Sequence, residues 1–202
     1  MTDTWIDLIR HGEPEGGPRY RGHAIDDPLS EKGWAQMRSA VAGHDDWQRI
    51  ITSPLRRCRD FATELATRRG LPVHVEHDLR EVGFGAWEGK TKAELIAEDA
   101  DGFHAFYRDP VNARPAGAEA LDAFTRRVAT SIDRIAVAYT GEHLLVVAHA
   151  GVLRTALAHA ICAPPSCMYH INIKNAALLR LRCGTDGHAL EELNNGTFSH
   201  TA

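Results

Sequence analysis

Short apolar runs alternate with longer segments of helical spacing along the first three quarters of the chain. The short runs cover residues 6–9, 49–52, 72–76 and 144–148, and the last of them is wholly apolar, which is typical of a strand covered on both faces. Strands that alternate with helices favour a parallel sheet. The pattern therefore predicts an α/β fold: a three-layer α/β/α sandwich with a mainly parallel central sheet and an antiparallel edge strand.

The intervening segments place apolar residues three or four positions apart. Ser30 is expected to cap the first helix, and Ser53 followed by Pro54 is the favoured start of the second, which Gly70 ends. The segment after residue 92 has a weaker helical pattern, and the segment after residue 121 has the clearest one. The predicted helices cover residues 30–43, 53–70, 92–108, 121–139 and 152–160.

The last quarter of the chain is less regular. Residues 168–173 and 176–183 are predicted as two further strands, which can form the antiparallel edge. The polar tail after Gly184 is predicted to be a loose surface segment. We expect one domain over residues 1–202, because no linker or repeat interrupts the pattern.

Composition narrows the class of protein. The chain has 202 residues, of which 44% are hydrophobic and 25% are charged, values typical of a globular domain. A formal net charge of −4 argues against a general nucleic-acid or membrane-surface binder. No run approaches the roughly 18 apolar residues that span a bilayer, and the first strand begins almost at Met1, so we predict a cytoplasmic protein.

Cysteines and histidines give no clear metal motif. The four cysteines are scattered, so buried free thiols are favoured, although a disulfide between Cys162 and Cys167 stays open. The twelve histidines include no HExxH motif and no close pair with a carboxylate. We therefore predict neither a metal site nor a cofactor.

The first apolar run ends at Arg10, His11 and Gly12. An imidazole can act as a nucleophile, and a guanidinium group matches phosphate oxygens well. The glycine lets the backbone turn tightly beside them. We hypothesise that His11 attacks a phosphoryl group.

Charged side chains follow the other predicted strands as well. The second strand leads into a helix whose first turns carry Arg56, Arg57 and Arg59, beside free N–H groups that attract anions. Glu81 lies in a loop after the third strand, and His149 follows the fourth. Ligands in such folds bind beyond the carboxyl ends of the strands, so these side chains are expected on one rim. Helical spacing alone does not select one arginine.

A long loop over residues 14–28 leaves directly from His11. Loops of this length in compact domains are often functional. Arg19, Arg21 and His23 in this loop either contact substrate or are solvated. We include Arg21 and His23 among the expected substrate-binding residues.

Five blocks, in this order, resemble the histidine phosphatase superfamily, which is also called phosphoglycerate mutase-like. RHG alone is a weak motif, whereas all five blocks together are highly specific. The blocks are residues 8–13 (LIRHGE), 28–36 (PLS with Gly33 and Gln36), 53–57 (SPLRR), 79–89 (LRE, FG and WEG) and 147–152 (VAHAGV).

The resemblance implies a metal-independent phosphomonoesterase. His11 would accept the phosphoryl group as a covalent phosphohistidine, while Arg10 and Arg57 bind its oxygens. The family pattern Ser-x-Leu-x-Arg selects Arg57 among the three arginines. His149 would complete a cationic pocket, and Glu81 would protonate the leaving oxygen and then activate water.

The chain departs from the family pattern in three places. Gly17 stands where many members carry a phosphate-binding Asn, and the loop over residues 22–28 is one residue longer than usual. Ala150 replaces the glycine that often follows the second His, but a backbone N–H can still bind the ligand there. We therefore expect Gly12 and Ala150 to contact substrate through the backbone.

Two alternative functions are kept beside hydrolysis. Mutases of the family carry a longer segment before the second His, with basic residues that bind the substrate. Here that segment is short, and Arg126 and Arg127 are more simply the solvated face of a helix. A non-catalytic module that binds a phosphorylated ligand is disfavoured because all five expected active-site residues are present.

The expected partner is a small phosphorylated metabolite, with no nucleic acid and no membrane; the oligomeric state is left open. The opening motif and the length are similar to those of small-molecule phosphatases, including the alpha-ribazole phosphatase-like group. Four aromatic residues either line a pocket above the phosphate or pack in the core, and the core is favoured for the two phenylalanines. They are Trp87, Phe103, Phe106 and Tyr107.

Overall fold

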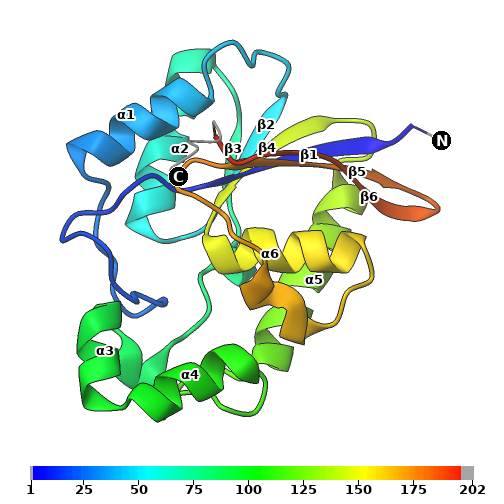
Figure 1. Cartoon of the computed structure of the whole chain (residues 1–202). Helices are drawn as coiled ribbons and strands as arrows, with labels where there is room; N and C mark the ends of the chain where they lie inside the picture. Colours follow the sequence, from blue (N-terminus) through cyan, green and yellow to red (C-terminus); the bar gives the residue numbers. More distant parts are fainter. Residues whose placement is uncertain (1, 197–202) are drawn as a thin grey trace.

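The computed structural model describes residues 2–196 and has three layers (Figure 1). A six-stranded sheet lies between two pairs of helices. Helices α1 (Glu31–Ala40) and α2 (Arg56–Arg69) cover one face, and α5 (Leu121–Ala138) and α6 (Ala150–Ala160) cover the other. The predicted α/β/α sandwich is confirmed.

The sheet has the strand order β3-β2-β4-β1-β5-β6. Its first four strands in this order are parallel, whereas β5 runs antiparallel to β1, and β6 antiparallel to β5. The predicted mainly parallel sheet with an antiparallel edge is therefore correct. The strands are β1 (Thr4–Arg10), β2 (Arg49–Thr52), β3 (Val73–Val75), β4 (His143–Ala148), β5 (Leu178–Gly184) and β6 (Gly187–Asn194).

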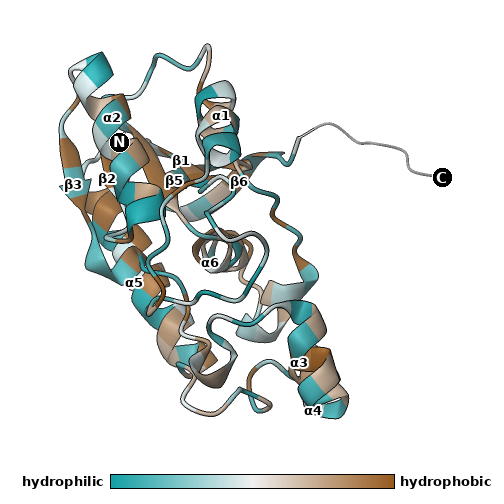
Figure 2. Ribbon diagram, turned by 90° about the vertical axis from the view of Figure 1, so that its left-hand side faces the viewer, coloured by the Kyte–Doolittle hydropathy of each residue, from teal (hydrophilic) through white to brown (hydrophobic). Residues whose placement is uncertain are grey.

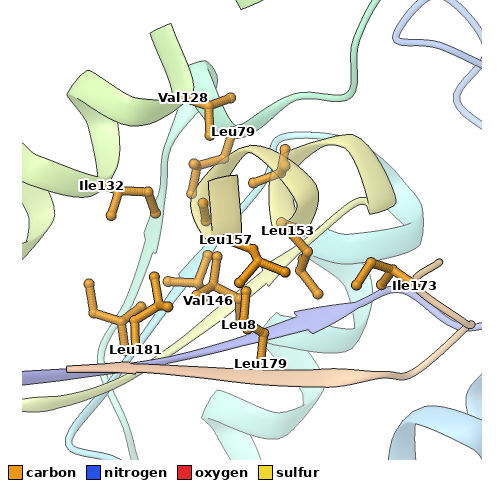
Figure 3. Packing of buried hydrophobic residues seen from close by; sticks show 14 of the residues in the cluster. Leu8, Leu79, Val128, Ile132, Val146, Leu153, Leu157, Ile173, Leu179 and Leu181 are labelled. Carbon is orange, nitrogen blue, oxygen red and sulfur yellow. The ribbon is translucent and has the colours of Figure 1, made fainter. Parts of the chain in front are cut away.

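Successive side chains of β1 point to opposite faces of the sheet, so both faces are covered by helices. Ile6 and Leu8 pack with α5 and α6, and Ile9 packs with α1 and α2. Figure 3 shows Leu8 beside Val146 of β4 and Leu153 of α6. Figure 2 shows helices α1 and α2 with both hydrophilic and hydrophobic residues along their length. The sheet is thus fixed from both sides, which holds its carboxyl rim in place.

The helical region predicted over residues 92–108 consists of two helices. Asp99 ends α3 (Lys92–Glu98) and caps α4 (Ala100–Arg108) through a 2.9 Å hydrogen bond from the backbone N–H of Gly102. Side chains such as Asp compete for backbone donors and so interrupt helices. Short 3-10 helices complete the fold at His77–Leu79, Gly85–Trp87 and Pro165–His170.

Two predictions for the last quarter of the chain are wrong. Residues 168–173 do not form a strand: Pro165–His170 is a 3-10 helix with proline in its first turn, and Met168 is buried against the core. As far as residue 196 the tail after Gly184 is not loose, because Gly187–Asn194 forms strand β6 at the edge of the sheet; residues 197–202 lie outside the described residues. This strand is mostly exposed, so its sequence lacks the apolar alternation by which strands are found.

The predicted start of the second helix is also shifted. Helix α2 begins at Arg56, after Leu55, which makes no side-chain cap. Ser53 is instead fully buried, and its hydroxyl faces the active site described below. Ser30 does cap α1, accepting a hydrogen bond from the N–H of Gly33 at 3.1 Å.

All four cysteines are free thiols. Cys58 and Cys183 are buried as expected, whereas Cys162 is exposed and Cys167 is partly exposed, and they form no disulfide. Among residues 2–196, every helix is too short or too polar to cross a bilayer.

Candidate active site

Parallel pairing of β1 with β4 brings the two predicted histidines together. In the register of this pair, Arg10 lies opposite Ala148, so the residues that follow them are neighbours. The backbone N–H of His11 donates to the carbonyl oxygen of Ala148 at 2.9 Å. The rings of His11 and His149 lie edge to face, with centroids 5.2 Å apart.

One hydrogen bond fixes the tautomer of His11. Its Nδ1 lies 2.7 Å from the carbonyl oxygen of Gly12. A carbonyl only accepts, so Nδ1 carries the proton and Nε2 keeps its lone pair. Burial, together with the positive charges of Arg10 and Arg57, holds the pKa of His11 well below its usual range. The imidazole is therefore neutral at pH 7.

His149 is also completely buried and caps the N-terminus of α6. Its Nε2 is 2.7 Å from the hydroxyl of Ser53, which fixes the orientation of the ring. Burial and the charge of Arg57 hold the pKa of His149 well below its usual range. The imidazole was expected to add a positive charge to the pocket, but a pKa this low makes it neutral at pH 7, and the positive charge comes from guanidinium groups.

Two buried guanidinium groups line the same cavity as His11. Arg10 donates from Nη1 to the carbonyl oxygen of Ile173 at 2.5 Å. Arg57 donates to the carbonyl oxygens of Ile25 (2.9 Å) and Gly22 (2.8 Å). The Nε atom of each arginine is buried and lacks a hydrogen-bond partner within residues 2–196. Two guanidinium groups at one cavity match the oxygens of an anion such as phosphate.

Arg10 keeps its charge despite its burial. Burial lowers the pKa of Arg10 to about 10, while the negative charge of Glu81 raises it. A pKa of this size leaves the guanidinium protonated at pH 7.

The carboxylate of Glu81 lies against the first turn of α6. Its Oε2 accepts from the backbone N–H of Gly151 at 3.3 Å, and its Oε1 accepts from that of Val82 at 3.0 Å. A helix N-terminus stabilises a carboxylate at this place. Glu81 and His149 are thus held by the same helix, on the same rim as His11.

Two arginines hold the loop that carries Glu81. Arg127 of α5 forms an ion pair with Glu119 (Nε to Oε1, 2.8 Å) and donates to the carbonyl oxygen of Glu81 at 3.2 Å. Arg114 donates to the carbonyl oxygen of Gly83 at 3.0 Å. The prediction that Arg127 belongs to the solvated face of α5 is wrong, since its side chain is only 12% exposed.

The side chains border a cavity of about 260 Å³. Tyr20 and Phe84 give it one aromatic wall, and Arg154 and Asn175 also line it. Arg154 donates from Nε to the carbonyl oxygen of Ile171 at 2.8 Å. A phosphate group and a small organic group fit a cavity of this size and composition.

Comparisons with known proteins agree with this geometry. The model of the histidine phosphatase superfamily (branch 1) matches residues 6–196. The chain belongs to this superfamily. Adenosylcobalamin/alpha-ribazole phosphatase of Salmonella typhimurium is 35% identical over 171 residues, which cover 83% of this chain and 84% of that protein. The predicted family is confirmed, and with it the prediction of a phosphomonoesterase-type enzyme.

Solved structures of other histidine phosphatases have the same fold. The alpha-ribazole phosphatase of Shigella flexneri superimposes with a TM-score of 0.82 at 30% identity, covering 96% of this chain and 100% of that one. A mycobacterial glucosyl-3-phosphoglycerate phosphatase complexed with VO3 gives a TM-score of 0.83 at 27% identity, covering 96% of this chain and 99% of that one.

The loop residues expected to bind substrate in this histidine phosphatase have different surroundings. The guanidinium of Arg21 borders the cavity but binds Asp27 at 2.8 Å and the carbonyl oxygens of Glu15 and Gly17. Arg21 therefore stabilises the conformation of its own loop. His23 does not line the cavity: its Nδ1 lies 3.1 Å from the carbonyl oxygen of Glu81.

Of the two small residues expected at the site, Ala150 lines the cavity, whereas Gly12 does not, although its neighbours His11 and Glu13 do. A Cβ atom at Gly12 would be 2.2 Å from the carbonyl oxygen of Gly33. The end of β1 thus touches the first turn of α1, and only glycine permits this approach. Gly12 of the RHG motif is required by packing.

Sequence analysis missed several residues of the site. Ser53 was assigned as a helix cap, although it binds His149. Arg154 lies one helical turn after Ala150, so helical spacing from the second His could have found it. Asn175 donates from Nδ2 to the carbonyl oxygen of His11 at 3.1 Å, but it comes from a turn with no motif to mark it.

Proposed function

We propose that this chain hydrolyses the phosphomonoester of a small metabolite through a phosphohistidine on His11. One observation carries the proposal. The guanidinium groups of Arg10 and Arg57 line one cavity with the neutral His11. Two guanidinium groups beside a nucleophile suit a phosphoryl group, which carries negative charge on three oxygens.

In the first step, the Nε2 lone pair of His11 attacks phosphorus, and the bond from phosphorus to the ester oxygen breaks. The leaving oxygen takes a proton from Glu81, which becomes a carboxylate. Arg10 and Arg57 stabilise the charge on the equatorial oxygens, so cationic side chains of this chain provide the electrostatic stabilisation of the transition state.

In the second step, Glu81 accepts a proton from water as the water oxygen attacks the phosphohistidine. The bond between nitrogen and phosphorus breaks, its electron pair returns to Nε2, and inorganic phosphate leaves. Glu81 is then protonated for the next cycle. The hydrogen bond from Nδ1 to Gly12 keeps the tautomer of His11 unchanged throughout.

The relatives suggest the first substrates to test. The Salmonella and Shigella relatives are named for alpha-ribazole phosphate, and the mycobacterial structure for glucosyl-3-phosphoglycerate. The aromatic wall of Tyr20 and Phe84 supports a substrate whose organic group has an apolar face. We therefore place alpha-ribazole 5'-phosphate first and a sugar phosphoglycerate second.

The test is hydrolysis of p-nitrophenyl phosphate in the presence of EDTA by wild type and His11→Ala. Removing a covalent nucleophile should lower kcat at least about 10⁴-fold. His74→Ala, an exposed histidine on β3, is the matched control and should keep full activity. Rapid acid-free quenching followed by mass spectrometry should find one phosphoryl group on wild type and none on His11→Ala.

Three results would overturn the proposal. Undiminished hydrolysis by His11→Ala excludes this nucleophile. Complete loss of activity in EDTA, restored by a divalent metal, excludes a metal-independent reaction. Accumulation of an isomer in place of inorganic phosphate, when phosphoglycerates are supplied, indicates a mutase.

A further inference from the structure

Three side chains with metal-binding atoms meet far from the active site. Asp133 comes from α5, His159 from the last turn of α6 and His188 from β6. Their ligand atoms all lie within 4.8 Å of one another. The sequence contains no close pair of histidines with a carboxylate, but the fold brings these three residues together from elements that the sequence separates.

Both imidazoles are directed at one carboxylate oxygen. Nε2 of His159 is 2.8 Å and Nε2 of His188 is 2.7 Å from Oδ1 of Asp133. The side chains of His159 and His188 are 33% and 13% exposed, whereas that of Asp133 is 51% exposed. The cluster is therefore sheltered on the histidine side and open to solvent on the carboxylate side, which gives an ion a route of entry.

The catalytic machinery does not use this cluster. His149 and His159 stand at opposite ends of α6, and ten residues of helix separate them by about 15 Å. The cluster is instead a junction between α5, α6 and the β5–β6 hairpin, which lies at the edge of the sheet.

We propose that Asp133, His159 and His188 form a binding site for Zn²⁺. Imidazole and carboxylate groups are the ligands that zinc accepts, and three protein ligands leave a fourth position for water. With two neutral imidazoles and one carboxylate, the ligand set has a charge of −1, which suits a divalent cation. Each imidazole would bind zinc through the Nε2 lone pair, so the proton that Nε2 now shares with Asp133 would move to Nδ1 of the same ring, and the ring would stay neutral.

The rearrangement that zinc requires at the carboxylate of Asp133 is small. Ligand atoms of a tetrahedral zinc site lie about 3.3 Å apart, because each bond is about 2.0–2.1 Å long. The present nitrogen-to-oxygen distances of 2.7 and 2.8 Å must therefore open by about half an ångström. Asp133 can move by this amount because its side chain faces solvent on one side.

Two features limit the expected affinity. Metal-bound histidines usually donate from the second ring nitrogen, but Nδ1 of His188 is buried and has no partner within residues 2–196. Cys183, which pairs with His188 across the hairpin, is not counted as a ligand, because burial raises the pKa of its thiol to about 12. We expect a dissociation constant on the order of 1 μM, weaker than that of structural zinc sites.

Zinc at this position would tie the edge hairpin to the two helices beneath it. The full chain, treated with EDTA and then freed of it, should bind one Zn²⁺ per chain in isothermal titration calorimetry. At a free zinc concentration of about 100 times Kd, the thermal unfolding midpoint should rise by about 5–10 °C. Mg²⁺, which prefers oxygen ligands, should leave the midpoint unchanged.

His159→Gln and His188→Gln should each weaken zinc binding at least tenfold, and Asp133→Asn is a second ligand variant that keeps the size of the side chain. His74→Gln, an exposed histidine on β3, is the matched control and should bind zinc as wild type does. Hydrolysis of p-nitrophenyl phosphate in EDTA reports whether each variant is folded and is expected to stay unchanged.

Zinc binding that is lost in all three ligand variants and kept in His74→Gln supports the site. The proposal is overturned if wild type does not bind zinc in the micromolar range. It is equally overturned if the folded ligand variants bind zinc as tightly as wild type does. Both outcomes are independent of whether His11 is the nucleophile.

Discussion

A methyl group at Gly151 should disable Glu81 without touching the nucleophile. Gly151 lies in the first turn of α6, and its N–H donates to the carboxylate of Glu81. A Cβ atom at this position would lie 2.3 Å from Oε1 of Glu81 and 3.1 Å from Cζ of Phe124. Gly151→Ala therefore forces the carboxylate away from its place on the helix.

The size of the effect follows from these distances. An unstrained contact needs about 3.4 Å or more, so the carboxylate oxygen must retreat by about 1 Å. A displacement of that size can cost a factor of about 100, within the 10²–10⁴ that general acid–base catalysis contributes. This factor equals about 2.7 kcal/mol of transition-state stabilisation. The 3.1 Å contact with the buried Phe124 adds strain, but Ala favours a helix over Gly by about 1 kcal/mol, so the free energy of unfolding should change little.

The assay compares kcat/KM for two esters, because this ratio reports the transfer of the phosphoryl group to His11. An alkyl phosphate has a poor leaving group that needs the proton of Glu81, so Gly151→Ala should lower its kcat/KM about 100-fold. The leaving group of p-nitrophenyl phosphate is stable as an anion, so its kcat/KM should fall less than about tenfold.

A double-mutant cycle tests whether Gly151→Ala acts through Glu81. If Gly151→Ala acts through Glu81, it should have almost no further effect in a Glu81→Ala background. Additive losses, or equal losses for both esters, would mean that the methyl group damages the site in another way. Wild-type activity of Gly151→Ala would refute the assigned position of the carboxylate.

Further predictions concern the two histidines and the buried Asp7. Because the folded-state pKa values of His11 and His149 lie below the unfolded value of about 6.5, their stabilisation is present above pH 6.5 and lost as the pH falls. Urea denaturation should show a loss of about 2 kcal/mol between pH 6.5 and 5.5, and about half of that in His149→Gln. Ser53→Ala removes the 2.7 Å hydrogen bond to His149 and should lower kcat about tenfold with little change in KM, measured by steady-state kinetics. The carboxylate of Asp7 is buried, which raises its pKa, but hydrogen bonds from Arg180 and others outweigh this and lower it. Asp7→Asn should cost about 2 kcal/mol in the free energy of unfolding at pH 7, and its difference from wild type should shrink below about pH 4.

The residues at the carboxyl rim of the sheet could be predicted from the sequence because a local sequence pattern marks each strand that ends there. Apolar runs mark the buried strands, and the residues that end parallel strands must lie on one edge. His11 and His149 are placed by this rule alone, since β1 and β4 are adjacent and in parallel register. Arg57 needed the family pattern in addition, because helical spacing does not distinguish it from Arg56 and Arg59.

What could not be predicted depends on partners that are distant in the chain. Strand β6 is held by backbone pairing with β5 and is mostly exposed, so no apolar alternation marks it. Arg127 has the helical spacing of a surface residue, yet the ion pair with Glu119 and the loop carbonyls bury it. The junction of Asp133, His159 and His188 likewise exists only after three elements have packed together.

The electrostatics of the site connect binding with nucleophilicity. Burial lowers the pKa of His11, and the positive charges of Arg10 and Arg57 lower it further. In the proposed mechanism the same arginines bind the phosphoryl group, so the groups that would attract the ligand also keep the proposed nucleophile unprotonated. Burial and then the charge of Arg57 lower the pKa of His149. A bound phosphoryl group that neutralised part of this charge would therefore make a proton on His149 less costly, and we expect His149 to add positive charge only in the ligand complex.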